Sequence, residues 1–135
     1  MDAENFIGLK HLQELDLSGN FIKTLDGSTF VSTPNLKILN LQNNNLAFVA
    51  IDALRGLSFL TTLDLSRNWL PNLHPDTFAP LPYSLKNQII LHENPIICNC
   101  DVRYLISWIT QYPKRVVEPN RLSCSHVSGI FKHSF

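Results

Sequence analysis

Residues 12–20 read LQELDLSGN, and the same pattern returns as LKILNLQNN at residues 36–44 and as LTTLDLSRN at residues 60–68. The copies start 24 residues apart, and each keeps three leucines and a final asparagine. Behind each asparagine follows a second apolar set, which is Ile22, Leu25 and Phe30, then Leu46, Val49 and Leu54, then Leu70, Leu73 and Phe78. Self-similarity at this period predicts a stack of equivalent structural units.

The spacing within one copy explains why the units must stack. In a short strand, Leu15 and Leu17 point to one side while Glu14, Asp16 and Ser18 point to the other. The second apolar set turns the coil back over the leucines and leads it into the next parallel strand. One unit cannot bury its leucines alone, so neighbouring copies must form a continuous core.

Each copy ends on an asparagine where the chain leaves the strand. An amide side chain both donates and accepts hydrogen bonds, so it can pair with backbone groups that the turn leaves free. We therefore expect a structural ladder rather than a binding site, formed by Asn20, Asn44, Asn68 and Asn94. The fourth copy is degraded, because Lys86 stands where its first leucine belongs.

The pattern LxxLxLxxNxLxxL resembles the leucine-rich-repeat family from residue 6 to about residue 97. The resemblance implies a solenoid, a segment of an α/β-type horseshoe with short parallel strands on the concave face and an irregular convex side. The expected divisions are the end of a truncated repeat at residues 1–11, repeats at 12–35, 36–59 and 60–84, a partial repeat at 85–94, and an incomplete cysteine-rich C-terminal cap at 95–135.

The beginning of the chain matches the middle of a repeat. Phe6 and Leu9 correspond to Phe78 and Leu81, and neither a cysteine-rich N-terminal cap nor a secretory signal precedes them. An open solenoid end exposes apolar surface and an unpaired strand edge. We expect a fragment of a longer receptor, and the alternative is self-association or contact with another chain through this end.

After Asn94 the pattern changes to the C-terminal cap. Residues 94–101 read NPIICNCD, and the following residues 102–112 predict an amphipathic helix with Asp101 as its N-cap, ending before Pro113. The apolar positions at helical spacing are Leu105, Trp108, Ile109 and Tyr112. Such a helix can cover the open end of the last coil.

The order of cysteines and tryptophan in the cap resembles the cysteine-rich C-terminal flank of extracellular leucine-rich-repeat proteins. The stretch YLISWITQYP at residues 104–113 is most similar to that flank in variable lymphocyte receptors and platelet glycoprotein Ib, while Toll-like receptors and Slit proteins share a looser pattern. The resemblance implies a disulfide between Cys98 and Cys124. It leaves Cys100 as a free thiol, an interchain cross-link or a cysteine without its partner. A disulfide implies a secreted protein or one on the extracellular face of the plasma membrane.

Zinc is the alternative use of these cysteines, with Cys98 and Cys100 joined by His92 or His126. The C-x-C spacing is tight for one tetrahedral ion and no second pair follows, so we expect no metal. No histidine stands in a nucleophile motif, and no glycine-rich phosphate loop occurs. We therefore expect neither a cofactor nor catalysis.

Composition narrows the range of partners. The 135 residues carry 11 basic and 11 acidic side chains, so the formal net charge is +0. A nucleic-acid groove needs clustered Lys and Arg, which this chain lacks. No apolar run approaches the ~20 residues of a membrane span, so we expect no membrane insertion in this segment.

The outward positions of successive strands predict a binding surface on the concave face. They are Glu14, Asp16 and Ser18, then Ile38, Asn40 and Gln42, then Thr62, Asp64 and Ser66, then Gln88, Ile90 and His92. Asp16 and Asp64 share a column with Asn40, and Glu14 adds a third acid, so the face suits a cationic partner. The alternative is that these aspartates are merely soluble strand residues.

Two further groups bear on function. Trp69 is expected to pack on Phe21 across the stack, the alternative being an aromatic anchor for a partner. Lys114 and Arg115 are expected to be solvated, the alternative being a ligand contact from the cap.

Together these features predict a non-catalytic extracellular recognition module that binds a protein or a microbial-surface ligand. The resemblance favours an immune-receptor role. One alternative is an adhesion or guidance module that binds a host protein. The other is a structural cap fragment with no ligand of its own.

Overall fold

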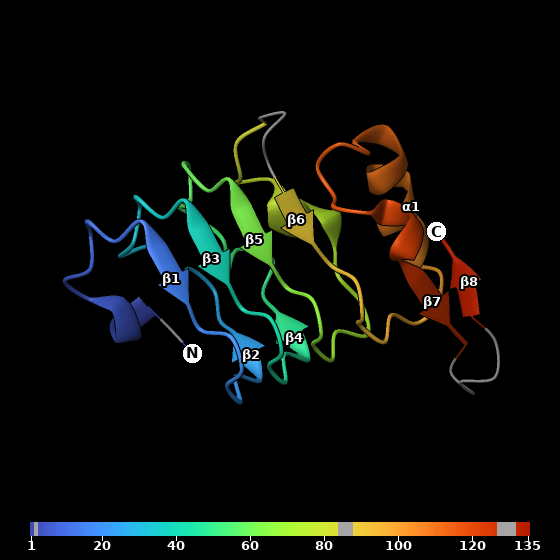
Figure 1. Ribbon diagram of the computed structural model, residues 1–135, viewed down its shortest axis with the longest axis horizontal. Coiled ribbons are helices and arrows are strands. Elements are labelled where there is room, and N and C mark those ends of the chain that lie inside the picture. Colours follow the sequence, from blue (N-terminus) through green and yellow to red (C-terminus); the bar gives the residue numbers. More distant parts are fainter. Residues whose placement is uncertain (2, 84–87, 127–131) are drawn as a thin grey trace.

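The repeated strands lie in register in the computed structural model, which describes residues 1, 3–83, 88–126 and 132–135. Strands β1 (Glu14–Asp16), β3 (Ile38–Asn40), β5 (Thr62–Asp64) and β6 (Gln88–Ile90) form one parallel sheet in that order, one strand from each coil (Figure 1). The predicted leucine-rich-repeat solenoid is confirmed. The predicted boundary at residues 84 and 85, and residues 127–131 of the cap, lie outside the described residues.

The core fills the space between the sheet and the returning half of each coil. On the far side, β2 (Thr24–Leu25) pairs in parallel with β4 (Phe48–Val49), and two short 3-10 helices follow the same path, η1 (Ala3–Phe6) and η2 (Pro75–Phe78). The strand leucines of the second and third copies are fully or almost fully buried: Leu39, Leu41, Leu63 and Leu65. Leu15 and Leu17 on β1 are only partly buried.

Three of the four repeat asparagines bridge neighbouring coils. Asn20 does not, because it is exposed and, among the described residues, donates only to the Leu17 and Ser18 carbonyl oxygens of its own coil. The Asn68 amide donates to the carbonyl oxygens of Leu41 and Leu65, at 3.0 and 3.1 Å, and its oxygen accepts from the Leu46 N–H at 3.0 Å. Asn44 and Asn94 repeat this arrangement on their own neighbours. Each side chain thus satisfies three backbone groups that would otherwise be buried without a partner.

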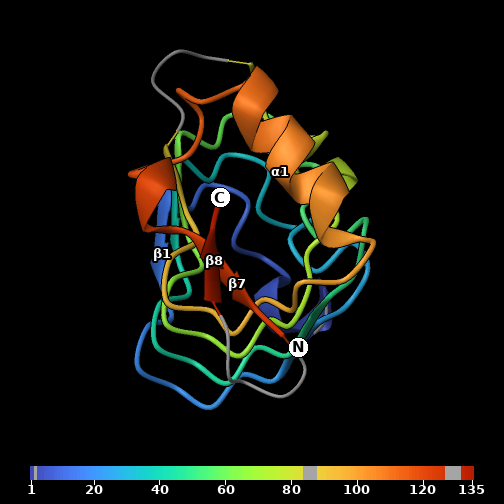
Figure 2. The same cartoon turned by 90° about the vertical axis from the view of Figure 1, so that its right-hand side faces the viewer.

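The cap closes the stack with a helix and a hairpin. Helix α1 (Val102–Gln111) buries Leu105 and Ile109, and Trp108 stacks on Phe78 with ring centroids 5.0 Å apart. Beyond it lie η3 (Pro119–Arg121), β7 (Ser123–Ser125) and β8 (Lys132–Ser134), the last two paired antiparallel. Figure 2 shows α1 on the side of the coil opposite the main sheet, with β7 and β8 across the end.

A disulfide within the cap and a strand bridge to the last coil hold the cap in place. Cys98 and Cys124 form a disulfide with Cα atoms 5.1 Å apart, so the Cys98 sulfur is not available as a metal ligand, whereas Cys100 is exposed with a free thiol. Val116 lies beside Ile89 as a further parallel bridge. The Ile89 N–H donates to the carbonyl oxygen of Arg115 at 2.9 Å, so the edge of β6 is covered.

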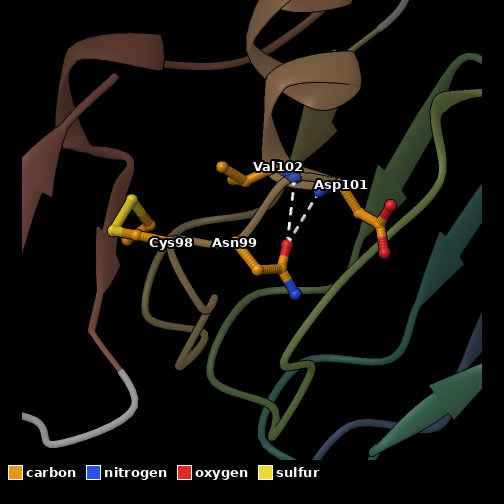
Figure 3. The surroundings of a disulfide bond; sticks show 5 residues. Cys98, Asn99, Asp101 and Val102 are labelled. Carbon is orange, nitrogen blue, oxygen red and sulfur yellow. Dashed lines mark hydrogen bonds between the residues drawn. A yellow bond between two sulfur atoms is a disulfide. The ribbon is translucent and has the colours of Figure 1, made fainter.

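Asp101 does not cap the helix as the sequence predicts. Its backbone is already helical (φ −76°, ψ −26°) and its side chain makes no capping hydrogen bond. Instead, the side-chain oxygen of Asn99 accepts from the N–H groups of Asp101 and Val102, at 3.0 and 3.2 Å (Figure 3). A capping residue needs an extended backbone to reach over the first turn, and Asp101 has passed that point.

The expectation that Arg115 is solvated is wrong. Its side chain is 5% exposed, and its guanidinium carbon lies 4.5 Å from the ring centroid of Tyr83 and 5.5 Å from that of Trp108. One guanidinium nitrogen donates to the Pro82 carbonyl oxygen at 3.4 Å. Removal from water lowers the pKa of Arg115, while Tyr83 opposes that shift. Lys114 is exposed.

Candidate interaction surface on the concave sheet

Register aligns the outward side chains of the four strands into rows. Neighbouring parallel strands lie about 4.8 Å apart, so each row is continuous across the sheet. The first row is Glu14, Ile38, Thr62 and Gln88, and the second is Asp16, Asn40, Asp64 and Ile90. Every member of both rows is exposed or partly exposed, so a partner has access to them.

The residues that follow the strands are less accessible. Ser18, Gln42 and His92 are partly buried, and Ser66 is 0% exposed. Ser66 is therefore not available to a partner, contrary to the expectation for that position. The third row contributes to the surface only through its other members.

Polar side chains of the second row also shape the turns after their strands. One Asp16 carboxylate oxygen accepts from the Ser18 N–H at 2.9 Å and from its hydroxyl at 2.6 Å. Asp64 makes the same pair of bonds with Ser66, and the Asn40 side-chain oxygen accepts from the Gln42 N–H at 3.0 Å. These side chains form Asx-type turns, so they have a structural task that the sequence interpretation did not assign.

The same hydrogen bonds affect ionisation at the acidic end of the face. The hydroxyl of Ser18, and then its N–H, lower the pKa of Asp16, because both stabilise the carboxylate. Within the described residues, Glu14, Asp16 and Asp64 have no ion-pair partner. The face therefore presents three uncompensated carboxylates to solvent.

At the other end of the face, charges are paired. Glu93 forms ion pairs with Arg67 at 2.9 Å and with Arg121 at 3.4 Å. Arg121 also forms an ion pair with Glu118 at 2.8 Å. The bond from Arg121, supported by its positive charge, lowers the pKa of Glu118, and the pKa of Arg121 is raised in return. This ion-pair network joins two repeat turns to the cap, and no sequence motif predicted it.

The aromatic residues beside the asparagines do not cover one another. Phe21 is 83% exposed and Trp69 is 65% exposed, so the expectation that they pack together is wrong. Phe21 belongs to the first copy of the repeat and Trp69 to the third, and the second copy has Asn45 at the equivalent position. Both rings are consequently accessible, in the turns that follow β1 and β5.

The side chains of this face are suited to non-covalent contacts. Among the described residues, no group of three or more His, Cys, Asp or Glu side chains is placed to hold a metal ion. In the same ranges, no helix is long and apolar enough to cross a bilayer. What the rows offer is a ridged polar surface with an acidic end and two apolar side chains, Ile38 and Ile90.

Comparisons with known proteins agree with this architecture. Trophoblast glycoprotein of Mus musculus is 29% identical over 119 residues, which are 88% of this chain and 28% of that protein. Toll-like receptor 5 of Homo sapiens is 32% identical over 114 residues, which are 84% of this chain and 12% of the receptor. The crystal structure of human 5T4, also named trophoblast glycoprotein, superposes with a TM-score of 0.79 at 28% identity and covers 93% of this chain and 45% of that one.

The chain therefore spans less than half the length of these relatives. A family model described as leucine rich repeat matches residues 1–46 and 34–86. These segments contain the first three strands of the sheet and the asparagine turns between them. By its repeats, its register and these matches, the chain belongs to the leucine-rich-repeat family.

Proposed function

We propose that this chain is a non-catalytic recognition module that binds a protein or a microbial-surface ligand on the concave face. The register that aligns two accessible rows across β1, β3, β5 and β6 is the observation that carries the proposal. Stacked repeats commonly use such an extended concave surface for binding. The disulfide favours an oxidising compartment, hence secretion or the extracellular face of the plasma membrane.

The charge distribution on the face favours a cationic partner. Glu14 and Asp16 are adjacent on β1, and Asp64 stands two strands away in the row of Asp16. A cluster of uncompensated carboxylates speeds encounter with a positively charged partner and disfavours a negatively charged one. Because the pKa of Asp16 is lowered, its carboxylate stays charged at pH values below the range in which aspartate ordinarily titrates.

The similarity to Toll-like receptor 5 favours an immune-receptor role, in line with the resemblance of the cap to variable lymphocyte receptors. An adhesion- or guidance-type module that binds a host protein is the second candidate. It is favoured by the looser resemblance of the cap to the C-terminal flank of Slit proteins.

A set of amide substitutions tests the acidic face without disturbing its turns. Asn40 shows that an amide oxygen makes the same turn bond, so Asp16→Asn and Asp64→Asn should fold normally. Together with Glu14→Gln they remove three negative charges. The matched control removes three exposed carboxylates elsewhere through Asp26→Asn, Asp52→Asn and Asp76→Asn.

Binding is measured on washed whole bacteria and on an array of purified cell-surface ectodomains. We expect the face variant to lose about tenfold in affinity and the control to keep it, with the difference shrinking as salt rises. Selective retention on bacteria supports the immune role, and selective retention on an ectodomain supports the adhesion role. Equal binding by the face variant and the unmodified chain would refute the acidic face. Retention on neither surface would favour the structural-fragment alternative.

A further inference from the structure

A cavity lies between the convex side of the third repeat and the cap helix, on the side of the coil opposite the main sheet. Its volume is about 160 Å³. The floor is apolar and is formed by Leu73, Ile96 and Leu105, all buried. The rim is polar and is formed by Asn72, His74 and Asp101, all exposed. The cavity thus has an apolar floor and a rim that is open to solvent.

The rim holds a carboxylate that the fold does not use. Because Asn99 caps α1, the Asp101 side chain is released from that task, and Figure 3 shows its carboxylate pointing away from the helix N-terminus. Within the described part of the chain it has no ion-pair partner. The adjacent cation, Arg103, instead lies over the ring of Tyr104 at 5.3 Å.

The histidine of the rim is held in place by its own turn. His74 Nδ1 accepts from the Asp76 N–H at 3.2 Å, and the ring lies 6.0 Å from that of Tyr104. Only its second ring nitrogen is left for an incoming group. Asn72 adds a side-chain amide oxygen to this rim as a further acceptor.

We propose that this cavity receives a lysine side chain of a protein partner. The four methylene groups of lysine match the apolar floor, and the ammonium group at their end matches Asp101. A volume of about 160 Å³ corresponds to roughly five water molecules, which is enough for a butylammonium group. A purely apolar side chain would leave the carboxylate without a partner, and an acidic one would be repelled by it. This site is separate from the concave face and does not depend on it.

The test is an NMR titration of the ¹⁵N-labelled full chain with Nα-acetyl-lysine methylamide, compared with the norleucine analogue. We expect saturable shifts of the amide signals of Leu73, Ile96 and Val102, with a dissociation constant in the millimolar range. The norleucine analogue keeps the stem and lacks the charge, so it should bind about fivefold to tenfold more weakly.

Asp101→Asn should weaken lysine binding by the same factor, whereas Asp52→Asn, which changes an exposed carboxylate outside the cavity, should leave it unchanged. Since Asn99 caps the helix, Asp101→Asn should keep the spectrum of the folded chain. The triple amide variant of the concave face should bind the lysine probe normally, which separates this site from the proposed function. Absence of shifts at the cavity, equal binding of norleucine, or an equal loss in Asp52→Asn would overturn the proposal.

Discussion

Short polar side chains at turns determine much of the local structure of this chain. Asp16, Asn40 and Asp64 each accept a hydrogen bond from the N–H two residues ahead, and Asn99 does the same before α1. In every case the acceptor stands at a turn, where backbone N–H groups lack partners. The identity of such a residue is thus set by the local backbone conformation, which residue spacing alone does not reveal.

Because Asn99 rather than Asp101 caps α1, substitutions at the two positions should have different effects on the free energy of unfolding. Asn99→Ala removes the acceptor for two N–H groups and should lower the free energy of unfolding by about 1 kcal/mol. Asp101→Ala, as the matched control, should change it by less than about 0.5 kcal/mol, because its side chain makes no capping bond. Urea unfolding followed by circular dichroism measures both. A larger loss in Asp101→Ala than in Asn99→Ala would contradict this assignment.

At the scale of elements, the cap is attached to the repeats through the sheet, whereas the disulfide joins two segments of the cap itself. Val116 adds a bridge beside Ile89, and Arg115, which precedes it, inserts its side chain between Tyr83 and Trp108. The segment from Arg115 to Val116 therefore links the sheet edge, the loop before β6 and helix α1. Cation–π contacts are strongest when the cation has lost its water, as it has here.

Truncation of this arginine should loosen the cap. Arg115→Ala removes two ring contacts and a large buried side chain, so the free energy of unfolding should fall by about 2 kcal/mol. Arg115→Met keeps the apolar stem and should recover part of the loss. Lys114→Ala changes an exposed neighbour and should be almost neutral. Denaturant unfolding checks all three, and equal effects of Arg115→Ala and Lys114→Ala would show that the ring contacts contribute nothing.

At the scale of the whole molecule, stability depends on place in the stack. Leu15, Leu39 and Leu63 occupy one position of the repeat, yet Leu39 and Leu63 are buried between neighbours while Leu15 on β1 is only partly buried. The apolar area that each leucine removes from water depends on the coils beside it. Self-association through the β1 side, which would bury Leu15 further, stays a prediction.

The same substitution should consequently have unequal costs along the chain. Leu39→Ala creates a cavity in the middle of the stack and should lower the free energy of unfolding by about 3 kcal/mol. Leu15→Ala, in the equivalent position, should cost about half as much, because part of that side chain already contacts solvent. Both are measured by urea unfolding at low protein concentration. Equal costs would mean that neighbouring coils do not govern burial here.

Local pattern was enough to predict the coil, the row of parallel strands and the asparagine turns, because the alternation of Leu15, Asp16 and Leu17 follows from strand geometry. The exposure of Trp69, the burial of Ser66 and Arg115, and the free carboxylate of Asp101 were beyond that pattern. Each of these depends on side chains and backbone groups that folding brings from elsewhere in the chain, and burial is a property of that assembled neighbourhood. The repeat pattern can be recognised from residues that are close in the sequence. The burial of a side chain depends on the coils that pack around it, so it is determined only in the folded stack.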